Sequence, residues 1–249
     1  MKKLLLILIT SLLVACSSTP SEPVLKIATS SGYPPYEMID PKTNKLIGFD
    51  IDLGELIAKE LGMTVEWLDM SFDGVIASLS TNTADIAIAG LSPDPKRDAL
   101  FSEIYYNNEE SPFYIVTKND SGIQSIDDIK GKTVGVQIAT IQESAVNQIK
   151  DTYDLTIDAR ESYHVMVQEV LIGRIDFLVM EPLVATQYLE EFENLEMFEL
   201  KATELEHLIG NAIALSKDNQ ELLDKINTVI LKLKDDGTLN ELADKWFNK

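Results

Sequence analysis

Residues 85–102 read DIAIAGLSPDPKRDALFS, and this stretch decides how the rest of the chain is interpreted. Its apolar run at 86–89 is typical of a buried strand, which a Gly-Leu-Ser turn and a proline-containing loop follow. Arg97 lies in that loop and is one of three arginines, with Arg160 and Arg174. A guanidinium is a planar fork of donors that holds a carboxylate through two hydrogen bonds. The stretch therefore predicts a small-anion site just after a strand.

The strand at 85–89 completes a β-α-β-α-β pattern. Apolar runs at 25–29 and 64–68 predict two earlier strands. Helical periodicity predicts helices at 50–61 and 72–79 between them. Strands that alternate with helices are typical of α/β proteins, so we expect an α/β fold.

A second α/β unit follows the first. It comprises a helical turn at 126–129, strands at 132–136, 155–159 and 177–180, and helices at 140–149, 163–172 and 183–189. A strand at 209–215 then returns to the first unit, and helices at 219–233 and 239–247 end the chain. The second unit is therefore predicted to be an insertion in the first.

This order predicts two lobes joined by two extended strands, with a ligand cleft between them. Residues 24–110 and 208–249 form lobe 1, and residues 111–207 form lobe 2. We expect the crossings near 107–114 and 200–211. Ligands of open α/β sheets bind beyond the carboxyl ends of the strands, which places the predicted anion site at this cleft.

The N-terminal residues are predicted to be a signal and not part of the fold. Lys2 and Lys3 precede an apolar run at 4–15, shorter than the ~20 residues that a membrane span needs. The run ends in Leu-Val-Ala-Cys, which resembles the lipobox of bacterial lipoproteins. We expect a lipoprotein signal peptide at 1–15, a lipid on Cys16 and a flexible tether at 16–23. The alternative is a secretory signal with an incidental cysteine.

Composition limits the partners. The chain carries 21 Lys and Arg against 41 Asp and Glu, a net charge of −20, which disfavours nucleic acid and anionic lipid. The single cysteine excludes a disulfide within the chain. The predicted signal is the only apolar run of the sequence that approaches spanning length. We therefore expect a protein of the cell envelope, outside the cytoplasm, tied to a membrane by its N-terminal lipid alone.

Several motifs, in this order, carry a family resemblance. They are GYPPYE at 32–37, IGFDIDL at 47–53, FDG at 72–74, AGLS at 89–92 with Arg97, FS at 101–102, GKTVGVQ at 131–137, TIQE at 140–143, ID at 175–176, and DGT with KWF between 236 and 247. Together they resemble the solute-binding proteins of polar amino-acid ABC transporters, which have the type II periplasmic-binding fold. The set spans nearly all of the chain after the signal.

The resemblance implies a binding site for the zwitterionic part of an amino acid. In lobe 1, Tyr33 stacks on the ligand side chain and Phe72 forms the opposite wall. The Gly90 carbonyl accepts from the ligand ammonium. Ser92 donates to the α-carboxylate, and Arg97 clamps it.

Lobe 2 is implied to complete the same site. Thr140 and Ile141 open a helix, where free N–H groups and the helix dipole favour the carboxylate. Glu181, where the family usually has Asp, pairs with the ammonium. Closure of the lobes then completes the shell around both charges.

The chain departs from the family pattern in ways that bear on specificity. Ser30 stands where many binders of basic amino acids carry an acid, and Ile141 stands where Ser or Thr is frequent. Ser30 argues against a cationic ligand. Basic amino acids stay open, because Glu37, Asp73 or Glu110 could replace that acid. The prediction is therefore a polar amino acid.

Each site residue also has a structural interpretation. Arg97 could be a surface arginine, Tyr33 and Phe72 core aromatics, Ser92 a turn residue, and Glu181 an exposed helix cap. Asp50, Asp52 and Glu55 are interpreted as acids of a helix N-terminus. The spacing of His164 and His207 does not suit a metal, so no cofactor is expected.

Three functions are consistent with these residues. The first is a lipid-anchored, monomeric binding protein that delivers an amino acid to the permease and ATPase of an ABC transporter. The second is a cyclohexadienyl dehydratase acting on prephenate or arogenate, with Glu181 as general acid. The third is a lipoprotein that presents its amino acid to a sensor. We expect the first, which breaks no bond.

Overall fold

The structure is a computed structural model that describes residues 22–107, 113–201 and 210–248. The predicted signal peptide and Cys16 lie outside the described residues, as do the predicted lobe boundaries at 110/111 and 207/208. Glu22 and Pro23, the end of the predicted tether, precede the first strand. Within the described ranges, no helix combines the length and apolarity needed to cross a membrane.

The first lobe is built on a sheet of order β4-β1-β5-β12-β6. Its strands are β1 (Val24–Thr29), β4 (Thr64–Asp69), β5 (Ile86–Ala87), β6 (Leu100–Phe101) and β12 (Ala214–Leu215). Strand β1 pairs in parallel with β4 and β5, whereas β12 pairs antiparallel with β5 and β6. The helices of this lobe are α1 (Phe49–Glu60), α2 (Phe72–Ser80), α6 (Gln220–Asp235) and α7 (Thr238–Phe247), and a small hairpin joins β2 (Met38–Ile39) to β3 (Leu46–Ile47).

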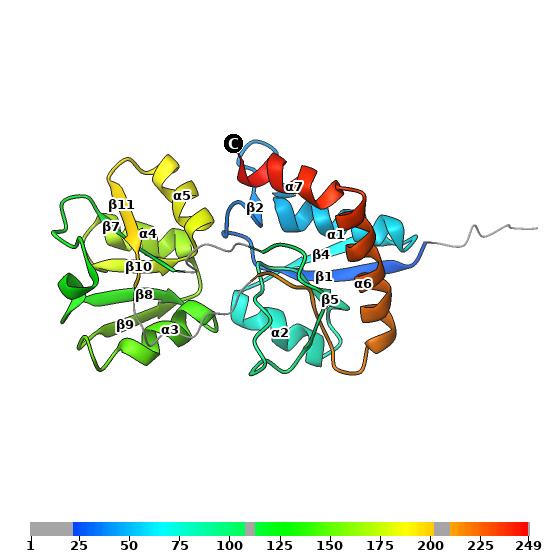
Figure 1. Ribbon diagram of the computed structural model, residues 1–249, viewed down its shortest axis with the longest axis horizontal. Coiled ribbons are helices and arrows are strands. Elements are labelled where there is room, and N and C mark those ends of the chain that lie inside the picture. The colour runs from blue at the N-terminus through cyan, green and yellow to red at the C-terminus, as the bar shows by residue number, and fades with distance from the viewer. Residues whose placement is uncertain (1–21, 108–112, 202–209, 249) are drawn as a thin grey trace, which may run out of the picture.

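The second lobe is built on a sheet of order β11-β7-β10-β8-β9. Its strands are β7 (Tyr114–Lys118), β8 (Thr133–Gln137), β9 (Thr156–Arg160), β10 (Phe177–Met180) and β11 (Leu195–Glu199). Its helices are α3 (Ile141–Ile149), α4 (Tyr163–Leu171) and α5 (Pro182–Glu191), with a 3₁₀ turn at Ile126–Ile129. Figure 1 shows this lobe on the left and the first lobe on the right.

The chain enters the second sheet and then returns to the first. Ala214 of β12 pairs with Ala87 of β5, although all five strands of the second sheet lie between them in sequence. Near the crossings, Tyr106 and Asn211 form an antiparallel bridge, so the outgoing and returning segments run side by side. The two-lobed α/β architecture predicted from the sequence is confirmed.

Several elements differ from their predicted form. The ladder in the first sheet covers only Ile86–Ala87 of the strand predicted at 85–89, and only Ala214–Leu215 of that predicted at 209–215. The residues that follow β5 turn away to form the cavity wall described below. Strands β7 and β11 were not predicted as strands. Strand β11 reads LEMFE, and its mixed polarity follows from an edge position where only one neighbour, β7, pairs with it.

Candidate ligand-binding site

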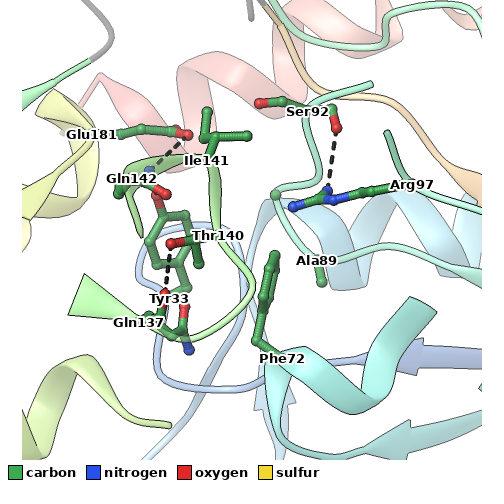
Figure 2. Close-up of a pocket in the computed structure, with 11 residues that line it drawn as sticks. Tyr33, Phe72, Ala89, Ser92, Arg97, Gln137, Thr140, Ile141, Gln142 and Glu181 are labelled. Atoms are coloured by element: carbon green, nitrogen blue, oxygen red, sulfur yellow. Dashed lines mark hydrogen bonds between the residues drawn. The ribbon is translucent and has the colours of Figure 1, made fainter. Parts of the chain in front are cut away.

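A cavity lies between the two lobes, and Figure 2 shows its lining residues. The first lobe contributes Tyr33, Phe72, Ala89, Gly90, Ser92 and Arg97. The second lobe contributes Gln137, Thr140, Ile141, Gln142 and Glu181. Every residue predicted for ligand binding except Ser30 therefore lies around one cavity.

Arg97 is held in the cavity wall by contacts from both lobes. Its Nη1 donates to the carbonyl of Ser92 at 3.2 Å, and its Nη2 donates to the carbonyl of Ala139 at 3.2 Å. The guanidinium lies over the Phe72 ring, 5.5 Å from the ring centroid, and the ring points toward it in Figure 2. Burial lowers the pKa of Arg97, but an arginine remains protonated in proteins. Arg97 is therefore a cavity residue and not a free surface arginine.

The loop that follows β5 brings backbone groups to the cavity. Gly90 has φ +57, a left-handed conformation that glycine adopts without strain. Its N–H donates to Asp50 at 2.6 Å, and its carbonyl accepts from the Asn211 side chain at 2.8 Å. An added Cβ would lie 3.2 Å from the Tyr33 ring, so a glycine leaves room for the aromatic wall. Ser92 is 4% exposed and turns its carbonyl to Arg97.

Helix α3 presents its N-terminus to the cavity. Thr140 is the N-cap: its hydroxyl accepts from the N–H of Glu143 at 3.1 Å and donates to the carbonyl of Gln137 at 2.7 Å. The N–H groups of a first helical turn have no acceptor within the helix, and the helix dipole favours an anion there. Thr140 and Ile141 thus begin a helix, as predicted, at the edge of the cavity.

Glu181 lies directly after β10 and precedes Pro182, the first residue of α5. It occupies the N-cap position, but its side chain makes no capping hydrogen bond. The carboxylate instead accepts from Gln142 at 3.5 Å and from Tyr33. Burial raises the pKa of Glu181 to about 7, while the hydrogen bonds from Tyr33 and Gln142 oppose that rise. The side chain therefore faces the cavity, which excludes the interpretation as an exposed cap.

Sequence reasoning missed three lining residues: Ala89, Gln137 and Gln142. Gln142 is 3% exposed, and its amide donates to the Tyr33 hydroxyl at 3.3 Å and to Glu181. Its position within the TIQE motif, one residue after Ile141, was the available signal. When a helix N-terminus faces a cavity, the side chains of its first turn also lie near that cavity.

The structure does not bring Ser30 into the cavity lining. Ser30 is 5% exposed and directly follows β1. Among the acids considered as substitutes for a residue at that place, Glu37 is wholly buried away from the lining and Asp73 is exposed in the first turn of α2. Glu110 lies outside the described residues. Glu181 is thus the one acidic side chain in the lining as far as the structure describes it.

Direct contacts join the lobes around the cavity. The Tyr188 hydroxyl of α5 donates to the carbonyl of Gly32 at 3.0 Å. The Tyr33 and Tyr163 rings lie 5.5 Å apart between centroids. Together with the Arg97–Ala139 hydrogen bond, these contacts show that the lobes close on one another around the cavity.

Arg97 and Glu181 are the charged residues of the lining within the described ranges, and they come from opposite lobes. One cationic and one anionic side chain in a small enclosed space suit a molecule that carries both charges. No cluster of potential metal ligands occurs in the described parts of the chain. Fold and site together define a two-lobed binding protein for a small charged molecule.

Residues 25–249 match the bacterial extracellular solute-binding proteins, family 3, and the chain belongs to this family. It is 36% identical to the arginine-binding extracellular protein ArtP of Bacillus subtilis, over 99% of this chain and 98% of the relative. Membership in this family gives the chain its type II periplasmic-binding fold and places it outside the cytoplasm.

Two solved structures extend the comparison. A Salmonella typhimurium periplasmic binding protein, described for its high arginine specificity, superposes with a TM-score of 0.84 at 28% identity, over 90% of this chain and 99% of that one. An ancestral amino-acid-binding protein, described as a precursor of cyclohexadienyl dehydratase, has a TM-score of 0.78 at 31% identity, over 90% and 95%. The chain is thus similar to amino-acid-binding proteins over nearly its whole length.

Proposed function

We propose that this chain captures a free polar amino acid between its lobes and delivers it to the permease of an ABC transporter, which an ATPase drives. The single observation that carries the proposal is the placement of Arg97 and Glu181 on opposite walls of one cavity. An amino acid is the common metabolite whose carboxylate and ammonium match such a pair. A relative from Escherichia coli that is named as a putative ABC transporter arginine-binding protein supports the same function.

In this proposal Arg97 holds the α-carboxylate. Its guanidinium already lies beside Ser92 and close to the N-terminus of α3, whose dipole favours an anion. Ser92 and the N–H groups of Thr140 and Ile141 supply further donors. The carboxylate thereby receives charge-assisted hydrogen bonds from both lobes.

Glu181 holds the ammonium of the ligand, and the ammonium donates a second hydrogen bond to the carbonyl of Gly90. An ammonium against the Glu181 carboxylate would offset the burial that raises the pKa of this group. Each lobe then supplies a partner for each charge. A ligand that contacts both lobes selects the closed state, because it binds that state more tightly than the open one.

L-Arginine is the first candidate for the amino acid. ArtP and the Salmonella protein are described as arginine-binding or arginine-specific. The cavity also has features that suit a guanidinium: the aromatic rings of Tyr33 and Phe72 can stack on its plane, and the amide oxygens of Gln137 and Gln142 can accept from it. Ser30 supplies no carboxylate for a cationic ligand side chain, so the affinities for glutamine and lysine should be compared with that for arginine.

We also propose the lobe division predicted above, with lobe 2 inserted between residues 110 and 208, and lipid attachment at Cys16. The Leu-Val-Ala-Cys sequence supports attachment. Replacing Cys16 with Ser should move the full-length protein from the detergent phase to the aqueous phase of a Triton X-114 partition and abolish labelling by palmitate. Unchanged labelling would contradict lipidation at this residue.

The dehydratase alternative rests on Glu181 as a general acid, a role that a raised pKa suits. A carboxylate that binds an ammonium is instead needed in its ionised form, and these relatives are described as binding proteins. We therefore propose that the chain is not an enzyme. Loss of prephenate or arogenate in its presence, absent in Glu181→Gln, would overturn this.

A thermal-shift screen of the twenty amino acids tests the proposed function. A ligand at 100-fold above its Kd should stabilise the protein by roughly 2.7 kcal/mol. We expect L-arginine to give the largest shift. No shift with any amino acid would refute amino-acid binding. A ligand-dependent signal from a sensor partner, in cells that lack the permease, would favour the sensory alternative.

A further inference from the structure

Two carboxyl groups lie in contact behind the cavity wall, where the ligand-binding roles given above do not use them. Glu37 follows the Tyr33–Tyr36 turn, and Asp50 lies in the first turn of α1. Both residues are 0% exposed, and the N–H of Asp50 donates at 3.0 Å to the carbonyl of Tyr36, the residue before Glu37, which makes the two acids neighbours. Two neighbouring buried carboxyl groups cannot both be ionised without a large cost, which favours a proton on one of them.

The described residues around the pair supply no positive charge to offset that cost. The titratable groups that face the pair are acids and tyrosines: Asp69 at the end of β4, Glu181 before α5, Tyr33 and Tyr36 in the preceding turn, and Tyr105 on the outgoing crossing. Within the described ranges, neither Glu37 nor Asp50 forms an ion pair with a lysine, arginine or histidine.

The hydrogen bonds show which of the two carries the proton. Asp50 accepts from the N–H of Gly90 at 2.6 Å and from the hydroxyl of Tyr105 at 2.9 and 3.0 Å. Neither carboxyl oxygen of Glu37 receives a donor from the described residues. Two donors, the N–H of Gly90 and the hydroxyl of Tyr105, favour the ionised form of Asp50. Burial raises the pKa of both groups, that of Asp50 to about 7, and Glu37 is the one whose neutral form its surroundings favour more.

The partners of Asp50 connect the pair to the ligand loop and to the crossing. Gly90 lines the cavity. The N–H of Tyr105 donates to the carbonyl of Asn211 at 2.9 Å, and the Asn211 side chain donates to the Gly90 carbonyl at 2.8 Å. Asp50 therefore holds Gly90 and Tyr105, and Asn211 joins these two residues to one another. These hydrogen bonds link the loop that follows β5 to both segments that cross between the lobes.

We propose that Glu37 is a positioning residue for ligand binding: in its protonated form it donates to Asp50 and keeps Asp50 in place to hold Gly90 and Tyr105. Glu37 touches neither the cavity nor the ligand in this proposal. Loss of its proton leaves two adjacent buried anions, which drives the groups apart and releases Gly90 from its position. The affinity readout rests on the proposed function, and a second readout below does not.

The proton on Glu37 determines how ligand affinity should depend on pH. Burial first, and then Asp50, raises the pKa of Glu37. Ligand affinity should be independent of this group while the proton is held and should fall above the pKa of Glu37, by up to about tenfold per pH unit. Tyr36 and Tyr105 do not account for this loss, because burial raises their pKa values well above the usual value.

The experiment compares Glu37→Gln with Glu37→Leu in titrations with L-arginine from about pH 6 to about pH 10. Glutamine keeps a donor toward Asp50 and cannot ionise, whereas leucine of similar size has no donor. We expect the glutamine variant to bind more tightly than the leucine variant at neutral pH. Its affinity should decline less steeply at alkaline pH than that of the unmodified protein, because it keeps only the decline that deprotonation of the ligand ammonium causes in every variant. Glu66→Gln, an exposed acid of β4, is the matched control and should keep the decline.

Equal affinity of the glutamine and leucine variants, or an alkaline decline in Glu37→Gln as steep as that of the unmodified protein, would overturn the proposal. Infrared spectroscopy separates its failure from failure of the proposed function, because it needs no ligand. The protein at neutral pH should show the C=O band of a protonated carboxyl that Glu37→Gln removes and Glu66→Gln does not. If that band is absent from the unmodified protein, the proposal is refuted whatever the chain binds.

Discussion

The guanidinium of Arg97 donates to the carbonyl oxygen of Ala139 at 3.2 Å, and this hydrogen bond joins the first lobe to the loop that precedes α3. The same guanidinium is bonded to Ser92 within its own lobe. Arg97 therefore lies where the ligand loop of one lobe meets a helix N-terminus of the other. A carboxylate at that position contacts both lobes at once, which links ligand binding to closure.

Replacing Arg97 with Ala should weaken amino-acid binding by about 2–5 kcal/mol, because it leaves the ligand carboxylate buried without a counter-charge. Arg97→Lys should recover only part of the loss, since an ammonium cannot form the two-pronged contact. Isothermal titration calorimetry measures both. Arg174→Ala is the control, because Arg174 pairs with Glu169 away from the cavity. Equal affinities in the unmodified protein and Arg97→Ala would contradict the assignment.

Affinity should also fall in mildly acidic solution because of Glu181. Burial raises the pKa of this carboxyl to about 7, and only its ionised form binds an ammonium. Below about pH 7 binding must release a proton, so the apparent affinity should decrease by up to about tenfold per pH unit. Glu181→Gln should bind more weakly and without this acidic decline. An acidic decline that persists in Glu181→Gln would show that another group causes it.

The same carboxyl should affect stability in the opposite direction. Without ligand, folding raises the pKa of Glu181 from its ordinary 4.5 to about 7, so the folded state binds more protons in that range. Glu181 should therefore make the free protein less stable as the pH rises from about 4.5 to about 7. Urea unfolding of the free protein and of Glu181→Gln measures the difference, which should be absent if the carboxyl titrates normally.

Gly90→Ala should reduce affinity by narrowing the cavity. The new Cβ would lie 3.2 Å from two atoms of the Tyr33 ring, and the left-handed backbone adds strain of about 1–2 kcal/mol. Gly122→Ala is a matched control, because Gly122 also has a positive φ but open space around it. Both variants should lose similar stability on thermal unfolding, and only Gly90→Ala should lose affinity. Loss of affinity in neither variant would place the ligand away from Gly90.

Removing the Tyr188 hydroxyl should speed ligand release. Tyr188→Phe deletes the hydrogen bond to the Gly32 carbonyl, which spans the lobes and is worth about 1 kcal/mol. Stopped-flow fluorescence should show a dissociation rate about fivefold higher, with the association rate little changed. Tyr153→Phe, in the turn between α3 and β9, should behave like the unmodified protein. An unchanged dissociation rate in Tyr188→Phe would mean that this contact does not stabilise the closed state.

The sequence predicted the helices and the site better than the sheet edges. Ordered motifs placed Arg97, Ser92 and Thr140 around one cavity, because they lie after a strand or at a helix start, where the fold exposes backbone donors. Strand β7 was not predicted, and only its first residue, Tyr114, falls in the predicted crossing at 107–114. Its role depends on pairing with β10 and β11, which are far from it in sequence.

Asp50 shows a second limit of prediction from the sequence. In the sequence it resembles any acid of a first helical turn, a position that favours negative charge. Its burial comes from Gly90 and Tyr105, which lie 40 and 55 residues away. Gln142 was missed for the same reason, because its partner Tyr33 belongs to the other lobe. Contacts between distant segments leave no local pattern.

Calorimetric titration of the unmodified protein and Arg97→Ala with L-arginine and with its α-amide tests most directly whether Arg97 holds an amino-acid carboxylate. The amide keeps the ammonium and the side chain but lacks the negative charge. We predict that the unmodified protein binds the acid at least about 100-fold more tightly than the amide, whereas Arg97→Ala binds the two within about threefold of each other. An undiminished preference for the acid in Arg97→Ala would show that the carboxylate is bound elsewhere.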